Sequence, residues 1–248
     1  MRIILSPAKQ MKELPDTLVY SDLPVFLEQT EEILGWLKAL SWEDLKKLWA
    51  CNDRIAEQNA ERLAHMDLRR NLTPTVLSYE GIAYQYMAPA VFEAGQISYI
   101  QDHLRILSAF YGVLRPMDGV TPYRLEMQAK ASIGGHKDLY ALWGRRLYEE
   151  VRDESGIILN LASKEYFKCI EAFLSPEDRF ITPVFCEEVG GKLVTKGTYA
   201  KMARGEMVRF MAENRIEDPR EIQRFDRLGY RFREALSSDE KYIFERLK

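Results

Sequence analysis

The chain has 248 residues, of which 46% are apolar and 29% charged, and its formal net charge at pH 7 is −3. This balance is typical of a globular protein with a substantial core and excludes intrinsically disordered and strongly basic, histone-like chains. No stretch approaches the roughly 20 apolar residues of a membrane span. The apolar run in Met1–Pro7 is too short for a signal peptide, so we expect a cytoplasmic protein with no membrane partner.

The cysteines and histidines lack the spacing of redox or metal motifs. They are Cys51, Cys169, Cys186, His65, His103 and His136. No Cys-x-x-Cys, His-x-x-x-His or Glu-x-x-His grouping occurs among them, so we expect reduced thiols, no metal and no cofactor.

In the first part of the chain, the residue pattern predicts one strand and then helices. Arg2–Leu5 is a short apolar run that ends in Ser-Pro and predicts a strand followed by a loop. Pro24–Met66 has helical spacing, with a capping box that begins at Ser41. Thr75–Tyr79 is rich in β-forming residues and predicts a strand.

The second part alternates between helix and strand patterns. Helical spacing of Ile97, Ile100, Leu104 and Leu107 predicts an amphipathic helix through Leu107. The later predictions are a helix over Asp138–Val151, a strand over Gly156–Leu161, a hairpin of Phe180–Glu187 with Lys192–Thr195, and a helix over Tyr199–Asn214. Interleaved strands and helices predict a single domain over residues 1–248, of the α/β or α+β class, with a mixed sheet flanked by helices.

The charge is unevenly distributed along the sequence. Residues 13–67 contain 12 acidic and 5 basic residues, a net charge of −7, so the rest of the chain carries +4 against the overall −3. A local basic face can therefore attract phosphates while the acidic segment points away from them. On the helix Tyr199–Asn214, helical geometry places Lys201 and Arg204 on one side. An ordinary solvated face explains that pattern equally well.

Two loops that follow strands carry polar and basic residues. Lys9 follows the first strand, and Ser163, Lys164 and Lys168 follow the strand Gly156–Leu161. Ligands collect at the carboxyl ends of strands in α/β sheets, and Ser163 is placed to cap a helix whose first amides suit an anion. The alternative is a simple capping serine with surface lysines.

The segment from His103 to Met127 is rich in arginine, with Gly112 at its centre. Arg105, Arg115 and Arg124 flank a glycine-bearing hairpin that could present backbone amides and guanidinium groups to a phosphodiester backbone. The alternative is a core strand with a glycine bulge, whose arginines pair with Asp118 and Glu126.

Several short runs, in order along the chain, resemble the YaaA family of peroxide-stress proteins. The matching runs are Leu5–Lys9, Phe110–Pro116 with Asp118, Pro122–Met127, Lys137–Tyr140, Asn160–Phe167, Tyr199–Gly205, Glu213–Arg215 and Gly229-Tyr230. Met202 stands where some members of the family have a lysine.

The resemblance implies a cytoplasmic protein that protects against hydrogen peroxide by restraining free intracellular iron. It also implies a compact domain with a basic cleft, a helix-hairpin-helix-like element and binding of double-stranded DNA without sequence preference. We expect such a protein to be a monomer with no catalytic residues. The residues expected to bind DNA are Lys9, Arg105, Gly112, Arg115, Arg124, Ser163, Lys164, Lys168, Lys201 and Arg204.

Two other functions are consistent with the sequence. An enzyme acting on a nucleic-acid base or nucleotide, in the manner of a glycosidase, could use Glu126, Glu165, Ser163 and Tyr166 as acid, base and phosphate-holding groups. Tyr111, Tyr123 and Tyr166 could supply an aromatic pocket for a base. Direct iron storage ranks lowest, because ferritin-like sites require Glu-x-x-His pairs on helices.

Overall fold

A strand buried on both faces, β1 (Arg2–Leu5), lies at the centre of the main sheet. In the computed structural model, which describes residues 1–247, the three aliphatic residues after Arg2 are at most 1% exposed. β1 pairs in parallel with β5 (Leu104–Ser108) on one side and with β8 (Ile157–Leu161) on the other. A continuous apolar run suits such a strand, because both of its faces are covered.

The main sheet formed within residues 1–247 is mixed and has eight strands. Its order is β11-β12-β9-β8-β1-β5-β6, with β10 paired to β9. Neighbours from β12 to β5 run parallel, whereas β6, β10 and β11 pair antiparallel with their partners. The remaining strands of this sheet are β6 (Gly112–Leu114), β9 (Arg179–Val189), β10 (Lys192–Val194), β11 (Tyr230–Phe232) and β12 (Lys241–Arg246). Two small ladders pair β2 (Gln10–Met11) with β4 (Tyr79–Glu80) and β3 (Thr73–Pro74) with β7 (Gly119–Val120).

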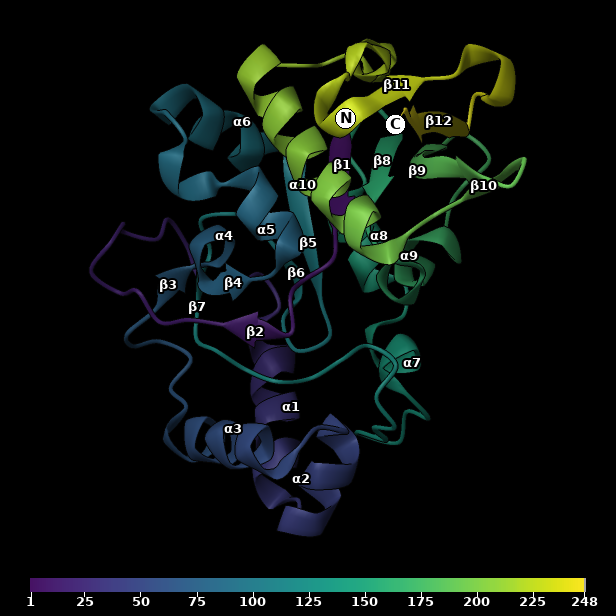
Figure 1. The fold of residues 1–248 in the computed structure, drawn as a ribbon. Helices are drawn as coiled ribbons and strands as arrows, with labels where there is room; N and C mark the ends of the chain where they lie inside the picture. The colour runs from purple at the N-terminus through teal and green to yellow at the C-terminus, as the bar shows by residue number, and fades with distance from the viewer. Residues whose placement is uncertain (248) are drawn as a thin grey trace.

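Two groups of helices stand out in Figure 1, one against the sheet and one projecting from it. In that view α10 lies in front of the sheet beside α5 and α6, whereas α1–α3 project at the end of the molecule away from both termini. The α-helices are α1 (Leu27–Ala39), α2 (Trp42–Trp49), α3 (Asp53–His65), α4 (Thr75–Ser78), α5 (Ile82–Met87), α6 (Ala94–His103), α7 (Leu139–Trp143), α8 (Arg146–Val151), α9 (Lys164–Glu171) and α10 (Gly197–Asn214). The 3-10 turns are η1 (Pro89–Val91), η2 (Pro219–Arg224), η3 (Arg227–Gly229) and η4 (Glu234–Leu236). None of the helices in residues 1–247 is long and apolar enough to cross a membrane.

Most of the predicted elements are present, and the mixed α/β class with a helix-flanked sheet is confirmed. The first strand, the helices of Pro24–Met66, the strand after Gly156, the β9–β10 hairpin and the long helix α10 all form as expected. The Ser41 hydroxyl accepts a hydrogen bond from the amide of Asp44 and so caps α2 as its sequence predicts.

Three predicted elements differ from the structure. Thr75–Ser78 forms the single helical turn α4 rather than a strand, with all four side chains buried, so tertiary packing overrides β propensity. The helix predicted to reach Leu107 ends at His103, because Leu104 begins the fully buried strand β5. Leu104 and Leu107 of this strand continue the helical spacing by coincidence. The helix predicted over Asp138–Val151 is interrupted at Gly144, which has φ of +52°.

The helix-hairpin-helix-like element is not confirmed. Phe110 and Tyr111 lie in the buried turn between β5 and β6, and their amides donate to the hydroxyl of Ser108. Gly112 has φ of +76°, and a Cβ there would lie 2.8 Å from atoms of both Phe26 and Trp143. The amides expected to face a phosphodiester backbone are therefore satisfied within the core.

α10 packs unusually closely against α5 at one glycine. A Cβ on Gly205 would lie 2.8 Å from the carbonyl carbon of Ala83, a backbone atom that cannot rotate away. Gly205 therefore sets how closely the two helices approach, and Arg204 is its immediate neighbour on α10.

We expect Gly205→Ala to lower the stability of the protein, because the added methyl group forces α10 away from α5. Overpacking of this kind costs roughly 1–3 kcal/mol in the free energy of unfolding. The measurement is the urea midpoint, followed by circular dichroism.

Gly197→Ala in the first turn of the same helix is the matched control, because a Cβ there meets nothing within 4 Å. We expect this control to be neutral or stabilising, since alanine has the higher helix propensity. Equal midpoints for the two variants would contradict the packing role of Gly205.

Candidate ligand-binding cleft

A cleft opens beyond the carboxyl ends of β1 and β8. Its cavity volume is about 390 Å³, and its walls come from α5, α10, the start of α9 and the segment Tyr123–Glu126. β1 and β8 are neighbours in the sheet, but the strands that follow them in this sheet lie on opposite sides of the pair. β5 follows β1 and lies next to it, whereas β9 follows β8 and lies next to that strand. Ligands of open α/β sheets bind in the crevice between two such strands, and a volume of this size suits a small molecule.

Two serines join the strand ends at the base of the cleft. The Ser6 hydroxyl accepts a hydrogen bond from the Ser163 amide at 2.8 Å and donates to the Ser163 hydroxyl at 3.1 Å. Ser163 occupies the N-cap position of α9, but its side chain makes no capping hydrogen bond. Its hydroxyl accepts the Ser6 proton, and its own proton has no acceptor among residues 1–247, so it can donate to a ligand.

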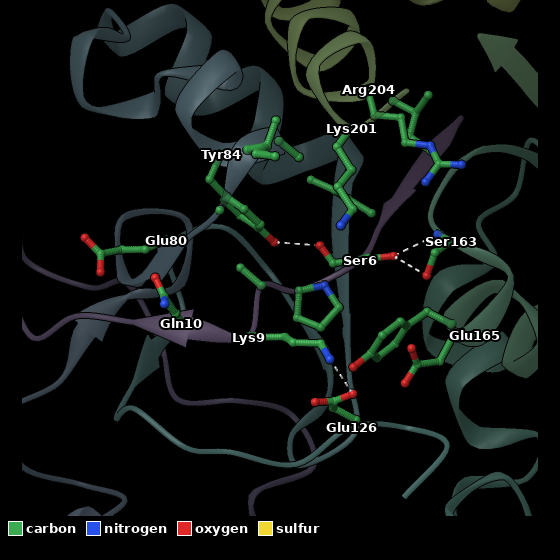
Figure 2. A pocket seen from close by; sticks show the side chains of 18 of the residues that line it. Ser6, Lys9, Gln10, Glu80, Tyr84, Glu126, Ser163, Glu165, Lys201 and Arg204 are labelled. Carbon is green, nitrogen blue, oxygen red and sulfur yellow. Dashed lines mark hydrogen bonds and ion pairs between the residues drawn. The ribbon is translucent and has the colours of Figure 1, made fainter. Parts of the chain in front are cut away.

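Two cations reach into the cavity from α10. Lys201 and Arg204 are one turn apart, and Figure 2 shows both side chains pointing from the helix toward the level of Ser6 and Ser163. Arg204 is half-buried, and its Nε atom is buried without a hydrogen-bond partner. Within the described part of the chain no carboxylate pairs with Arg204, and burial lowers the pKa of its guanidinium.

The other two cations of the cleft are already paired. Glu126 accepts from Lys9 Nζ at 2.9 Å and from Arg124 Nη2 at 2.8 Å. The Arg124 side chain is only 10% exposed and also donates to the backbone oxygen of Lys9, whereas Lys9 is 66% exposed. Arg124 therefore supports the wall of the cleft, and Lys9 stands at its mouth.

A second carboxylate, Glu165, lies beside Glu126 on the same side of the cavity (Figure 2). Its oxygen accepts a hydrogen bond from the Gln128 amide at 3.3 Å. Burial raises the pKa of Glu165, and the negative charge of Glu126 raises it further, while Lys9 acts in the opposite direction. The side of the cleft opposite Lys201 and Arg204 is therefore acidic and can hold a proton more readily than an exposed glutamate.

Tyrosines supply much of the remaining wall. Tyr84 donates from its hydroxyl to the Ser6 carbonyl at 2.9 Å, and Tyr123 and Tyr166 also line the cavity. The Tyr123 hydroxyl lies 2.8 Å from that of Tyr79 and 2.7 Å from that of Ser108, and burial raises its pKa to about 12. These phenols are neutral at physiological pH and offer ring surface to a ligand.

The cleft gathers five of the ten residues that the sequence analysis singled out for DNA. They are Lys9, Arg124, Ser163, Lys201 and Arg204. Lys164 and Lys168 lie exposed on α9, directly after Ser163. Glu126, Glu165, Ser163 and Tyr166, the groups considered for an enzyme, also line the cavity.

The remaining three residues lie elsewhere. Arg105 is buried in β5 and donates to the carbonyls of Gln101 and Leu104; burial and the charges of Arg2 and Arg115 lower its pKa to about 10. Arg115 pairs with Glu150 at 3.7 Å, and Gly112 is enclosed in the core.

Two further residues of the cleft, Ser6 and Tyr84, were not predicted as site residues. Ser6 directly follows a strand, so the rule that selected Ser163 could have selected it as well. Tyr84 lies in α5, a short helix for which the sequence analysis made no prediction, and no pattern in the sequence identifies it.

Comparison with known proteins places the chain among related sequences over nearly its full length. A family profile described as "Peroxide stress protein YaaA" matches residues 1–236. A UPF0246 protein of Agathobacter rectalis is 67% identical over 246 residues, which is 99% of each chain. A UPF0246 protein of Lachnoclostridium phytofermentans is 54% identical over 244 residues, which is 98% of this chain and 96% of the relative. A UPF0246 protein of Limosilactobacillus reuteri is 50% identical over 249 residues, which is 100% of each chain.

The thiols of the chain bear on any chemistry with peroxide. Cys169 and Cys186 are buried, and burial raises the pKa of Cys169 to about 12 and that of Cys186 above its usual value. Peroxide and alkylating reagents react with the thiolate, which both sites disfavour. Among residues 1–247, no group of three or more His, Cys, Asp or Glu side chains is placed to hold a metal ion.

We therefore expect Cys169 and Cys186 to resist iodoacetamide and hydrogen peroxide in the native protein at pH 7.5 and to react fully in urea. Peptide mass spectrometry measures the modified fraction at each site, with the half-buried Cys51 as an internal comparison. Native modification of Cys169 as fast as in urea would contradict the burial described here.

Proposed function

Because the chain belongs to the family of peroxide stress protein YaaA, we propose that it protects cytoplasmic DNA by binding duplexes without sequence preference at the mouth of the cleft. As part of this proposal, the protein also limits the damage caused by free intracellular iron. The family membership supports a stress-protection role, and the DNA and iron components go beyond it. The observation that carries the DNA component is that exposed lysines lie on the segments that form the cleft or directly follow them.

Those lysines come from three separate segments. Lys9 follows β1, Lys164 and Lys168 lie one turn apart on α9, and Lys201 lies on α10; all four are exposed. Only Lys9 has a close carboxylate partner among them in residues 1–247. The helices α1–α3, which together carry a net negative charge, project at the opposite end from α10 (Figure 1), so their charge lies away from the opening of the cleft.

We expect the double variant Lys164→Glu/Lys168→Glu to bind a duplex oligonucleotide at least about tenfold more weakly than the unmodified chain, because two phosphate contacts become repulsive. Loss of two contacts should also reduce the slope of log affinity against log salt by about 2. Fluorescence anisotropy with duplexes of unrelated sequence measures both quantities.

The control is Lys38→Glu/Lys47→Glu on α1 and α2, which changes the net charge equally at two exposed positions of the acidic helices. Equal weakening by both double variants would show that only total charge matters. Either that result or binding unaffected by the α9 variant would reject the lysine assignment.

A second candidate function is an enzyme acting on a nucleic-acid base or nucleotide within the same cleft. The observation that favours it is the pair Glu126 and Glu165, which face the cavity opposite Arg204 and differ in environment. Glu126 is paired with two cations, whereas burial favours the protonated form of Glu165 and raises its pKa. Acid–base catalysis uses two carboxyl groups with such different environments.

We expect any such activity to be lost in Glu165→Gln, which keeps the shape of the side chain but cannot exchange a proton. Nucleotides and oligonucleotides with damaged bases would be incubated with each protein, and mass spectrometry would detect a released base or changed mass. Lys38→Gln on the exposed face of α1, which does not line the cleft, serves as the control. Unchanged substrates with the unmodified protein would reject the enzymatic role.

A further inference from the structure

We propose that the interior of the cleft is a binding site for the phosphate of a small phosphate monoester, held by Arg204, Lys201 and the hydroxyl of Ser163. This inference goes beyond the proposed function. It concerns the enclosed cavity rather than the exposed lysines of α9, and it does not require duplex DNA to bind at the mouth.

The first support is the state of Arg204. Arg204 is half-buried in the lining of the cleft and points toward Ser163 (Figure 2), yet no carboxylate of the described chain neutralises it. The other arginine of the cavity differs, since Arg124 pairs with Glu126, which also accepts from Lys9. A half-buried arginine without an anion is costly, and a phosphate matches its fork of donors.

The second support is the Ser6–Ser163 pair beneath the two cations. Because Ser6 donates to Ser163, the proton of the Ser163 hydroxyl is left available to the cavity. The Ser163 side chain does not cap α9, so the first amides of that eight-residue helix keep their partial positive charge. Donors therefore converge from α10 above and from the strand ends below, as Figure 2 shows.

The acidic side of the cavity, formed by Glu126 and Glu165, restricts which other chemical groups the ligand can have. Within residues 1–247 no cation forms an ion pair with Glu165, and Glu126 already contacts two. A second phosphate there would meet like charge, whereas hydroxyl or amine groups could donate to Glu165. Rings of Tyr84, Tyr123 and Tyr166 add apolar wall. The cavity thus fits one phosphate joined to a compact body that carries hydrogen-bond donors, within about 390 Å³.

Isothermal titration calorimetry tests this assignment with inorganic phosphate, adenosine 5′-monophosphate and adenosine as probes. We expect the monophosphate to bind and adenosine to bind at least about tenfold more weakly, since the charge-assisted contacts are lost. Arg204→Gln should weaken the monophosphate by about tenfold or more, and Ser163→Ala by about threefold. Arg204→Lys should restore part of the loss by restoring the charge.

Arg209→Gln is the matched control, because it removes a guanidinium from α10 that pairs with Glu213 and does not line the cleft. The urea midpoint of every variant establishes that it is folded. A 5′-phosphorylated single-stranded oligonucleotide and its unphosphorylated form identify the source of the phosphate. Selective binding of the phosphorylated strand over the mononucleotide assigns the site to a DNA end, and the reverse assigns it to a free metabolite.

Three results would overturn the proposal: no saturable binding of any phosphorylated probe up to about 1 mM, equal binding of adenosine and its monophosphate, or equal weakening by Arg204→Gln and Arg209→Gln. These outcomes are separate from those for duplex DNA, because the α9 lysine variants leave Arg204 and Ser163 in place. Failure of one proposal therefore does not imply failure of the other.

Discussion

The parallel pairing of β1 with β8 is the constraint on which the cleft depends. It brings Leu5 opposite Leu161, so that Ser6 and Ser163, 157 residues apart in the chain, are within hydrogen-bond distance. Both strands are deeply buried and their register is fixed by the core, since a slip of one residue would turn side chains to the wrong face. The polar base of the cleft is thus held by the buried centre of the main sheet.

Some polar groups of the cleft are paired within the protein and others are not. The paired groups shape the wall, and the unpaired groups remain free to contact a ligand. Glu126 holds Lys9 and Arg124 in place, so these contacts serve mainly to shape the wall. Arg204 and Ser163 keep donors without protein partners in residues 1–247. Exposed lysines on α9 lie outside the cavity and meet water, where salt screens their attraction for phosphate.

Much of the fold could be predicted from local patterns, but the site could be predicted only in part. The buried strand after Met1, the Ser41 cap and the glycine turn of β9–β10 follow from short-range rules. The end of α6 at His103 could not be predicted, because a buried strand and a helix share apolar residues at a spacing of three.

The basic residues of the site could likewise be predicted from the sequence only in part. Lys201 and Arg204 share a helix face, so helical geometry placed them together, as the structure has them. Arg105 and Arg124 resemble each other in sequence context, yet one is enclosed by backbone carbonyls in β5 and the other pairs with Glu126. Contacts between residues far apart in the sequence determine which arginine is enclosed and which is paired. The spacing of residues along the chain does not reveal such contacts.

The close approach of α10 and α5 at Gly205 connects the packing of two helices with the position of a residue that lines the cleft. The residue that permits this approach is the immediate neighbour of the one that carries the unpaired guanidinium. Any larger side chain at position 205 would push α10 away from α5. The same movement would shift the guanidinium of Arg204 relative to the cleft. A substitution at Gly205 is therefore expected to change helix packing and the position of Arg204 together.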